Sequence, residues 1–154
     1  MDDLKFLTAG IPLAAEGKGY TRGFDIIKNM GLDGLEAEFV HGVRISEDNI
    51  SVCQNAVKNG LTLTCHAPFY VNLNAKEPEK VEASVGRILE TARVAKSMNA
   101  FSITYHAAFY MGNDKDVVFD RVAKQTEIIT KTLAEEDNKV WIRPNFVVLF
   151  GKCF

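Results

Sequence analysis

The sequence has few of the features that mark specialised classes of protein. It contains three cysteines, Cys53, Cys65 and Cys153, with no CxxC spacing, which disfavours a disulfide framework and a cysteine zinc knuckle. No apolar run approaches the ~20 residues that span a bilayer. The acids Asp2 and Asp3 stand where a secretory signal carries basic residues. We therefore expect a cytoplasmic protein with no membrane segment.

A large charge of either sign is also missing. Eighteen Lys and Arg residues against twenty Asp and Glu residues give a net charge of -2. Bulk electrostatic attraction therefore does not hold this protein on nucleic acid, although a local basic surface is compatible with the composition. Of the 154 residues, 47% are hydrophobic and 25% are charged, which is typical of globular proteins and disfavours disorder and coiled coils. The length predicts about one domain.

Short apolar segments alternate with longer segments of helical periodicity along the chain. The five predicted strands are Leu4 to Ile11, Leu35 to Val40, Leu61 to His66, Phe101 to His106 and Val140 to Arg143. Helices are predicted between them, with starts marked by Thr21, Ser46, Pro78 and either Asn113 or Asp114. This alternation predicts an α/β fold in which parallel strands are joined by crossover helices.

Two α/β folds fit this pattern. A closed (βα)8 TIM barrel needs about 200 to 250 residues, so five strands would form about its first half, whereas a flavodoxin-like sheet uses five strands and five helices. After Pro144 the sequence is apolar and aromatic without amphipathic spacing, so the fifth helix is missing. We favour a partial barrel domain over residues 1–144 followed by a divergent apolar tail over 145–154, with the flavodoxin-like sheet as the alternative.

The third and fourth predicted strands end in the same pattern. The segment TLTCHAPFY begins at Thr62 and the segment SITYHAAFY begins at Ser102. Because side chains alternate along a strand, His66 and His106 each end a face of small hydroxyl residues. Both histidines lie at the carboxyl ends of neighbouring strands, where imidazoles can converge on a metal ion. The alternative is that each histidine is a hydrogen-bonded structural group.

Four other residues are weaker candidates. Glu38 near the end of the second predicted strand is placed to orient a ligating histidine, or is an acid in a solvated loop. Arg44 in the following loop is placed to meet a phosphate, or is solvated. Phe69 and Tyr70 in the loop above the site are suited to stacking on bases, with core packing as the alternative.

The segment His66-Ala-Pro-Phe-Tyr-Val-Asn-Leu73, together with His106, resembles the endonuclease IV family of apurinic/apyrimidinic (AP) endonucleases. The resemblance covers nearly the whole chain, to about Pro144. That family belongs to the xylose isomerase-like TIM barrels and cleaves DNA on the 5′ side of abasic sites with a cluster of zinc ions. The resemblance therefore implies Zn2+ as a cofactor and DNA containing abasic sites as a partner.

Carried over position by position, the resemblance implies that His66 and His106 are zinc ligands. Phe69 and Tyr70 would lie in the loop that the family inserts into DNA at the abasic site, and Arg44 in another loop that meets DNA. The implied reaction is metal-assisted hydrolysis, in which zinc makes hydroxide available near neutral pH and stabilises the leaving oxygen.

The chain also departs from the family pattern. The family places a glutamate ligand at the end of strand five, where this chain has Asn145, and the remaining ligands belong to strands six to eight. His106 is followed by Ala107-Ala108 in place of the usual Pro-Gly. We hypothesise that the chain is a truncated endonuclease IV-like protein that does not incise abasic DNA alone. Its open sheet edges predict self-association.

Two other functions fit the same residues. A xylose isomerase-like sugar isomerase or epimerase also uses a metal with His and Glu residues at the strand ends, and Glu38 would then matter more than the loop aromatics. A small α/β domain that binds a ligand or partner without catalysis is the third hypothesis.

Overall fold

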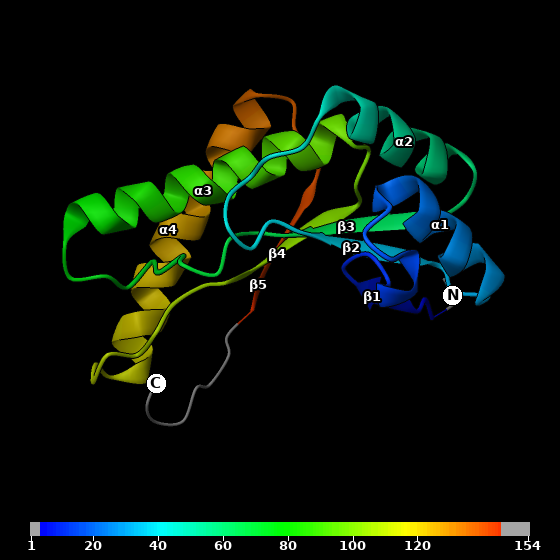
Figure 1. Cartoon of the computed structure of the whole chain (residues 1–154). Helices are drawn as coiled ribbons and strands as arrows, with labels where there is room; N and C mark the ends of the chain where they lie inside the picture. The colour runs from blue at the N-terminus through cyan, green and yellow to red at the C-terminus, as the bar shows by residue number, and fades with distance from the viewer. Residues whose placement is uncertain (1–3, 146–154) are drawn as a thin grey trace.

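The computed structural model describes residues 4–145. Five strands alternate with helices along these residues (Figure 1). The elements are β1 (Leu7–Ala9), the 3-10 helix η1 (Leu13–Ala15), α1 (Gly19–Asn29), β2 (Gly34–Glu38), α2 (Glu47–Lys58), β3 (Thr62–His66), α3 (Pro78–Ser97), β4 (Ser102–His106), α4 (Lys115–Glu135) and β5 (Trp141–Asn145). In the part of the chain that the structure describes, no helix is long and apolar enough to cross a membrane.

The sheet is parallel and its strands follow one another in chain order, β1-β2-β3-β4-β5. Right-handed crossovers that always step in the same direction place every helix on the same face of the sheet, and Figure 1 shows the helices gathered along one side of the strands. A flavodoxin-like sheet has the order 2-1-3-4-5 with helices on both faces. The strand order therefore excludes that alternative and confirms the prediction of part of a TIM barrel.

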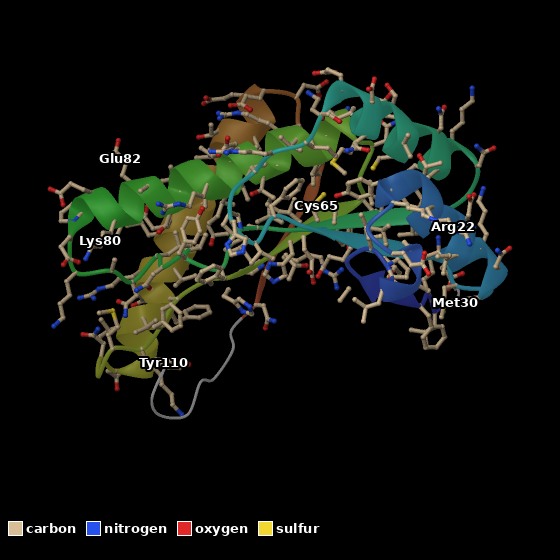
Figure 2. All side chains as sticks on the ribbon, in the orientation of Figure 1. Arg22, Met30, Cys65, Lys80, Glu82 and Tyr110 are labelled. Carbon is tan, nitrogen blue, oxygen red and sulfur yellow. The ribbon has the colours of Figure 1, made fainter. Side chains whose placement is uncertain are left out.

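The helix-covered face of the sheet carries the hydrophobic core. Leu63 and Cys65 of β3 and Ile103 and Tyr105 of β4 are at most 1% exposed, and Figure 2 shows Cys65 between the sheet and the helices. The helices contribute the following buried residues to the same core: Phe24, Ile27, Cys53, Ile88, Ala92, Val122, Ile129 and Leu133. The predicted alternation of β3 and β4, with large side chains under the helices, is confirmed.

The opposite face of the sheet is polar and forms an open hollow of about 410 Å³. Glu36, Thr64 and Arg143 line it from three strands, and the Thr64 hydroxyl donates a hydrogen bond to Glu36 Oε2 over 3.4 Å. Lys5 Nζ donates to Thr62 Oγ1 over 3.0 Å at the lower end of this face. In a closed barrel this face is the interior, so the open hollow is the inner wall of a partial barrel.

Three of the four predicted helix starts agree with the structure. Ser46 caps α2 and Asp114 caps α4 through their side-chain oxygens, and Pro78 is the first residue of α3, as predicted. The prediction that Thr21 caps the first helix is wrong, because α1 begins at Gly19 without a side-chain cap. Gly19 has a φ of 71°, which turns the chain into the helix two residues before Thr21.

Two strands differ in length from their predictions. β1 is shorter because the Phe6 N–H donates to Asp33 Oδ2 over 2.7 Å and Gly10, with a φ of 73°, turns the chain away. β5 extends to Asn145. The Trp141 N–H donates to the Phe101 oxygen before β4, and the Asn145 oxygen accepts from the Ala107 N–H after it. Pro144 therefore points its missing donor at the open edge, where proline is tolerated. The predicted tail from residue 146 onward lies outside the described residues.

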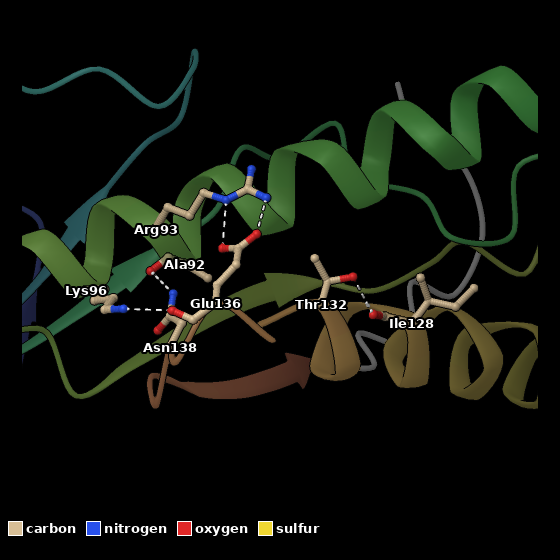
Figure 3. A network of polar contacts seen from close by, with 7 residues as sticks. All are labelled: Ala92, Arg93, Lys96, Ile128, Thr132, Glu136 and Asn138. Carbon is tan, nitrogen blue, oxygen red and sulfur yellow. Dashed lines mark hydrogen bonds and ion pairs between the residues drawn. The ribbon is translucent and has the colours of Figure 1, made fainter. Parts of the chain in front are cut away.

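A polar network joins the carboxyl-terminal halves of α3 and α4 (Figure 3). Arg93 donates from Nε and Nη2 to both carboxylate oxygens of Glu136. Lys96 Nζ donates to the Glu136 backbone oxygen over 3.0 Å, and the buried Asn138 Nδ2 donates to the Ala92 oxygen over 2.9 Å. Because α4 has no basic residue in its last turn, Lys96 supplies the cation that a helix carboxyl terminus favours.

Candidate metal and substrate site

His66 and His106 lie side by side at the carboxyl ends of β3 and β4. Their ring centroids are 5.1 Å apart and their planes are tilted by 54°. In the sheet ladder His66 is opposite Thr104, and His106 is opposite Asn145. Since residues that pair across parallel strands point to the same face, both imidazoles project on the polar face, at its upper rim.

The ring nitrogens of the two histidines suit a metal ion. His66 Nδ1 lies 2.7 Å from the Ala67 carbonyl oxygen; a carbonyl only accepts, so Nδ1 donates to it and Nε2 is the ring nitrogen left to bind a metal. His106 Nδ1 is buried and has no hydrogen-bond partner among residues 4–145. Burial lowers the pKa of His106, and the neighbouring His66 lowers it further, which favours the neutral imidazole that binds metals.

Carboxylates lie on the neighbouring strand but do not complete a metal site. Glu38 is opposite His66 in the ladder and is exposed. A Cβ at Gly10 would lie 3.2 Å from Glu38 Oε2, so the glycine leaves room for this carboxylate. Over residues 4–145, no group of three His, Cys, Asp or Glu side chains is close enough to hold a metal ion. A zinc ion takes four ligands, and the described residues supply two imidazoles.

Asn145 occupies the next strand end along the sheet. It is opposite His106 in the β4–β5 ladder, and its backbone oxygen accepts a hydrogen bond from the Ala107 N–H over 3.1 Å. A carboxylate at this position would therefore stand beside the histidine pair. The neutral amide of Asn145 is a poorer ligand for zinc than a carboxylate.

The loop after β3 presents an array of rings at the mouth of the site. Phe69 is 54% exposed and Tyr70 is 41% exposed, and their rings meet edge to face at 5.2 Å. His41 from the loop after β2 meets Phe69 edge to face at 6.3 Å. The Arg87 guanidinium lies 4.5 Å from the centre of the Tyr70 ring. Phe69 is thus the ring most open to a ligand, and Arg87 covers one face of Tyr70.

Two asparagines fasten this loop to the loop after β4. Asn72 Oδ1 accepts from the Phe109 N–H over 3.3 Å, and the buried Asn74 donates from Nδ2 to the backbone oxygens of Phe109 and Tyr110. Figure 2 shows Tyr110 where the chain passes from β4 toward α4. Asn74 and Arg87 were not predicted as functional residues, because their partners lie far away in sequence.

Arg44 lies away from the histidine pair. It is exposed and lines a hollow of about 640 Å³ together with Arg93 and Ser97, between α2 and α3. None of the histidines or mouth aromatics lines this hollow. The structure therefore brings His66 and His106 together and places Arg44 in a separate hollow.

Comparison with known proteins gives a family and one sequence relative. Residues 24–146 match the family described as xylose isomerase-like TIM barrel. The uncharacterized protein MJ0133 of Methanocaldococcus jannaschii is 33% identical over 141 residues, which are 92% of this chain and 50% of the relative. The chain therefore spans half the length of that relative.

Solved structures show the same architecture. Endonuclease IV from Thermus thermophilus superposes with a TM-score of 0.63 at 15% identity, over 85% of this chain and 48% of that chain. A D-tagatose 3-epimerase-like protein superposes with a TM-score of 0.66 at 18% identity, over 94% of this chain and 55% of that chain. At these identities the superpositions show the fold alone, and again this chain corresponds to about half of each structure.

Proposed function

Because this chain belongs to the xylose isomerase-like TIM barrel family, we propose that His66 and His106 form half of the zinc centre of a phosphodiesterase that acts at abasic sites in DNA. The observation that carries the proposal is the paired imidazoles at adjacent strand ends, 5.1 Å apart, with a buried ring nitrogen on His106 that no described residue satisfies. A buried polar atom without a partner is costly in a structural role, and a metal ion would satisfy it.

The residues have distinct roles in this proposal. His66 and His106 hold the zinc ion, with His66 fixed in orientation by its bond to the Ala67 carbonyl. Bound zinc supplies a Lewis acid and lowers the pKa of a bound water. The exposed Phe69 ring enters the gap where a base is missing and stacks on its neighbours. Arg87 holds Tyr70 beside Phe69.

In this proposal the described residues form only part of the zinc site. The described residues provide two zinc ligands, and this chain spans about half of its relatives. The other ligands must come from residues outside the described part of the chain or from a second polypeptide. We therefore expect the 154-residue chain alone to bind zinc weakly and not to incise abasic DNA.

A sugar isomerase or epimerase is the second candidate, and one observation favours it. Glu38 lies directly opposite His66 in the sheet ladder, which would place a carboxylate within the site of a small hydroxylated substrate. The exposed Phe69 ring favours the phosphodiesterase, because an open ring is placed to stack on bases, whereas a small-molecule pocket encloses most of its ligand.

Binding measurements with matched variants separate the two functions. Fluorescence anisotropy would compare a duplex carrying an abasic-site analogue with an intact duplex of the same sequence. We expect the wild-type chain to prefer the abasic duplex and Phe69→Ala to reduce its affinity by about fivefold or more, since stacking contributes roughly 1–3 kcal/mol per base. Phe101→Ala is the control, because Phe101 is equally exposed at 53% but precedes β4, at the opposite end of the strands.

The other outcomes point elsewhere. Equal binding of the two duplexes, together with D-fructose binding that is lost in Glu38→Gln, would support the sugar isomerase or epimerase. Binding of neither DNA nor sugar would contradict both enzymes and leave the non-enzymatic binding module. Incision of abasic DNA by the purified chain alone would contradict the divided site while supporting the activity.

A further inference from the structure

A cleft on the outer side of the partial barrel gathers three cations. It has a volume of about 420 Å³ and lies between the loop before α3 and the first half of α4. Lys76, Arg121 and Lys124 line it together with the amides of Asn113 and Gln125, and no carboxylate is among its described lining residues. The whole chain has a net charge of -2, so this is a local concentration of positive charge.

Arg121 is held in position by a buried neutral group. Its Nη1 donates to Asn74 Oδ1 over 2.8 Å. Asn74 is 1% exposed, and its own amide nitrogen is fixed by the Phe109 oxygen at 2.8 Å. An amide oxygen orients the guanidinium without neutralising it, and the other guanidinium N–H groups remain as donors. Arg121 is therefore a positioned cation.

The two lysines add further cations to the cleft beside Arg121. Lys124 follows Arg121 by three residues and so lies on the same face of α4, while Lys76 comes from the loop before α3. Within the chain from residue 4 to residue 145, neither lysine makes an ion pair. Like charges that face one cleft repel one another, and a bound anion removes that repulsion.

An apolar trough continues from the cationic cleft. It has a volume of about 460 Å³ and shares Ala75, Lys76, Val81 and Gln125 with the cleft. Its remaining lining residues are Pro78, Val85 and Ile128, with the exposed acid Glu82. Figure 2 shows Glu82 on the N-terminal half of α3. A carboxylate beside the trough repels a second anionic group.

We propose that this cleft binds a small phosphomonoester, with the phosphate between Lys76, Arg121 and Lys124 and an uncharged, largely apolar skeleton in the trough. Guanidinium and ammonium groups are the donors that phosphate groups bind. The Glu82 carboxylate disfavours a nucleic-acid strand, which carries a charge at every nucleotide. The site shares no lining residue with the histidine pair and does not depend on the function proposed above.

Isothermal titration calorimetry with phenyl phosphate tests the proposal. We expect saturable binding by the wild-type chain, weaker binding of inorganic phosphate, and a loss of about fivefold or more in affinity for phenyl phosphate in Lys76→Ala and in Lys124→Ala. Lys131→Ala is the control, because Lys131 is also on α4 but is paired with Glu127 over 2.7 Å. All three lysines are exposed, and circular dichroism would verify that each variant is folded.

Several results would overturn the proposal. Absence of saturable binding of phenyl phosphate by the wild-type chain would show that the cleft is a solvated basic surface. An equal loss in Lys131→Ala would show that the effect is non-specific electrostatic attraction. Equal affinity for inorganic phosphate would remove the apolar trough from the site, and tighter binding of an oligothymidylate that depends on Lys76 and Lys124 would identify a nucleic-acid surface instead.

Discussion

Asn138 fastens the segment after α4 to α3, and we expect Asn138→Ala to destabilise the protein. The side chain is 7% exposed. Its Nδ2 donates to the Ala92 oxygen over 2.9 Å, and its Oδ1 accepts from the Val140 N–H over 3.1 Å. Alanine removes both hydrogen bonds. Because the second bond fixes the residue just before β5, the substitution loosens the entry to the edge strand as well as the α3 contact.

The magnitude follows from these two bonds. A net hydrogen bond contributes about 1 kcal/mol, so the expected loss in the free energy of unfolding is about 2 kcal/mol, rising to about 3 kcal/mol if the Val140 N–H remains buried without a partner. The Ala92 oxygen lies within α3 and keeps its intrahelical hydrogen bond. The loss in the free energy of unfolding is therefore smaller than if both the Ala92 oxygen and the Val140 N–H were left without a partner. For a chain of this length the corresponding fall in Tm is about 4–8 °C.

Urea unfolding followed by circular dichroism measures this loss. Lys139→Ala is the matched control at the adjacent position, since Lys139 and its partner Asp137 are 88% and 83% exposed and the pair adds little. We expect the control to unfold like the parent. If Asn138→Ala fell within about 0.5 kcal/mol of the parent, as substitutions at plain surface positions do, the argument that this buried amide fastens β5 to α3 would be refuted.

Three further predictions concern the site, the cysteines and the open sheet. Asn145→Glu places a carboxylate opposite His106, and we expect it to tighten zinc binding by at least about tenfold in competition with a chromogenic chelator, whereas Asn145→Gln leaves it unchanged; equal affinity in both variants would contradict the site. Burial raises the pKa of Cys53 and of Cys65 to about 12. In a Cys153→Ser background we therefore expect a thiol reagent at about pH 8 to label neither cysteine until urea unfolds the chain; rapid labelling of either in the native protein would show that it is accessible. We also expect the free energy of unfolding to fall as the pH rises from about 9 toward 12, because the thiols of the unfolded chain ionise first. Multi-angle light scattering should detect self-association that increases with concentration, because β1 and β5 have no outer partner strand in the described chain; a monomer at every concentration would contradict that argument.

The features that the sequence predicted correctly depend on local chemistry or on a general rule of chain topology. Ser46 and Pro78 mark helix starts through their own side chain or ring, so their neighbours in sequence are sufficient information. The parallel sheet follows from the alternation of strands and helices, and β3 lies beside β4 in both of the strand orders that the sequence allowed. The adjacency of His66 and His106 follows in turn, because residues that end neighbouring parallel strands meet at one edge.

The features that it missed depend on distant partners or on backbone conformation. Thr21 has a suitable side chain for a helix cap, but the positive φ of Gly19 starts the helix earlier. Arg87 stacks on Tyr70 from a separate helix, and no pattern near either residue indicates the other. Arg44 has the residue type of a phosphate contact, and the loop after β2 places it beside α2 and α3; its contact with DNA stays a prediction.

The two asparagines between the mouth loops have a consequence for exchanging parts among relatives. Asn72 and Asn74 are in the loop after β3, yet Asn72 Oδ1 and Asn74 Nδ2 bond to backbone groups of Phe109 and Tyr110 in the loop after β4. Apart from Met111 Sδ, which accepts from Asn72 Nδ2 over 3.4 Å, the partner loop contributes main-chain atoms to these bonds, so most of its side chains are free to vary while its backbone path is fixed. A chimera that takes the first loop alone from a relative loses the fastening, whereas one that takes both loops keeps it. The two loops must therefore be exchanged together, and side chains on them can then change ligand preference while the hydrogen bonds between the loops are kept.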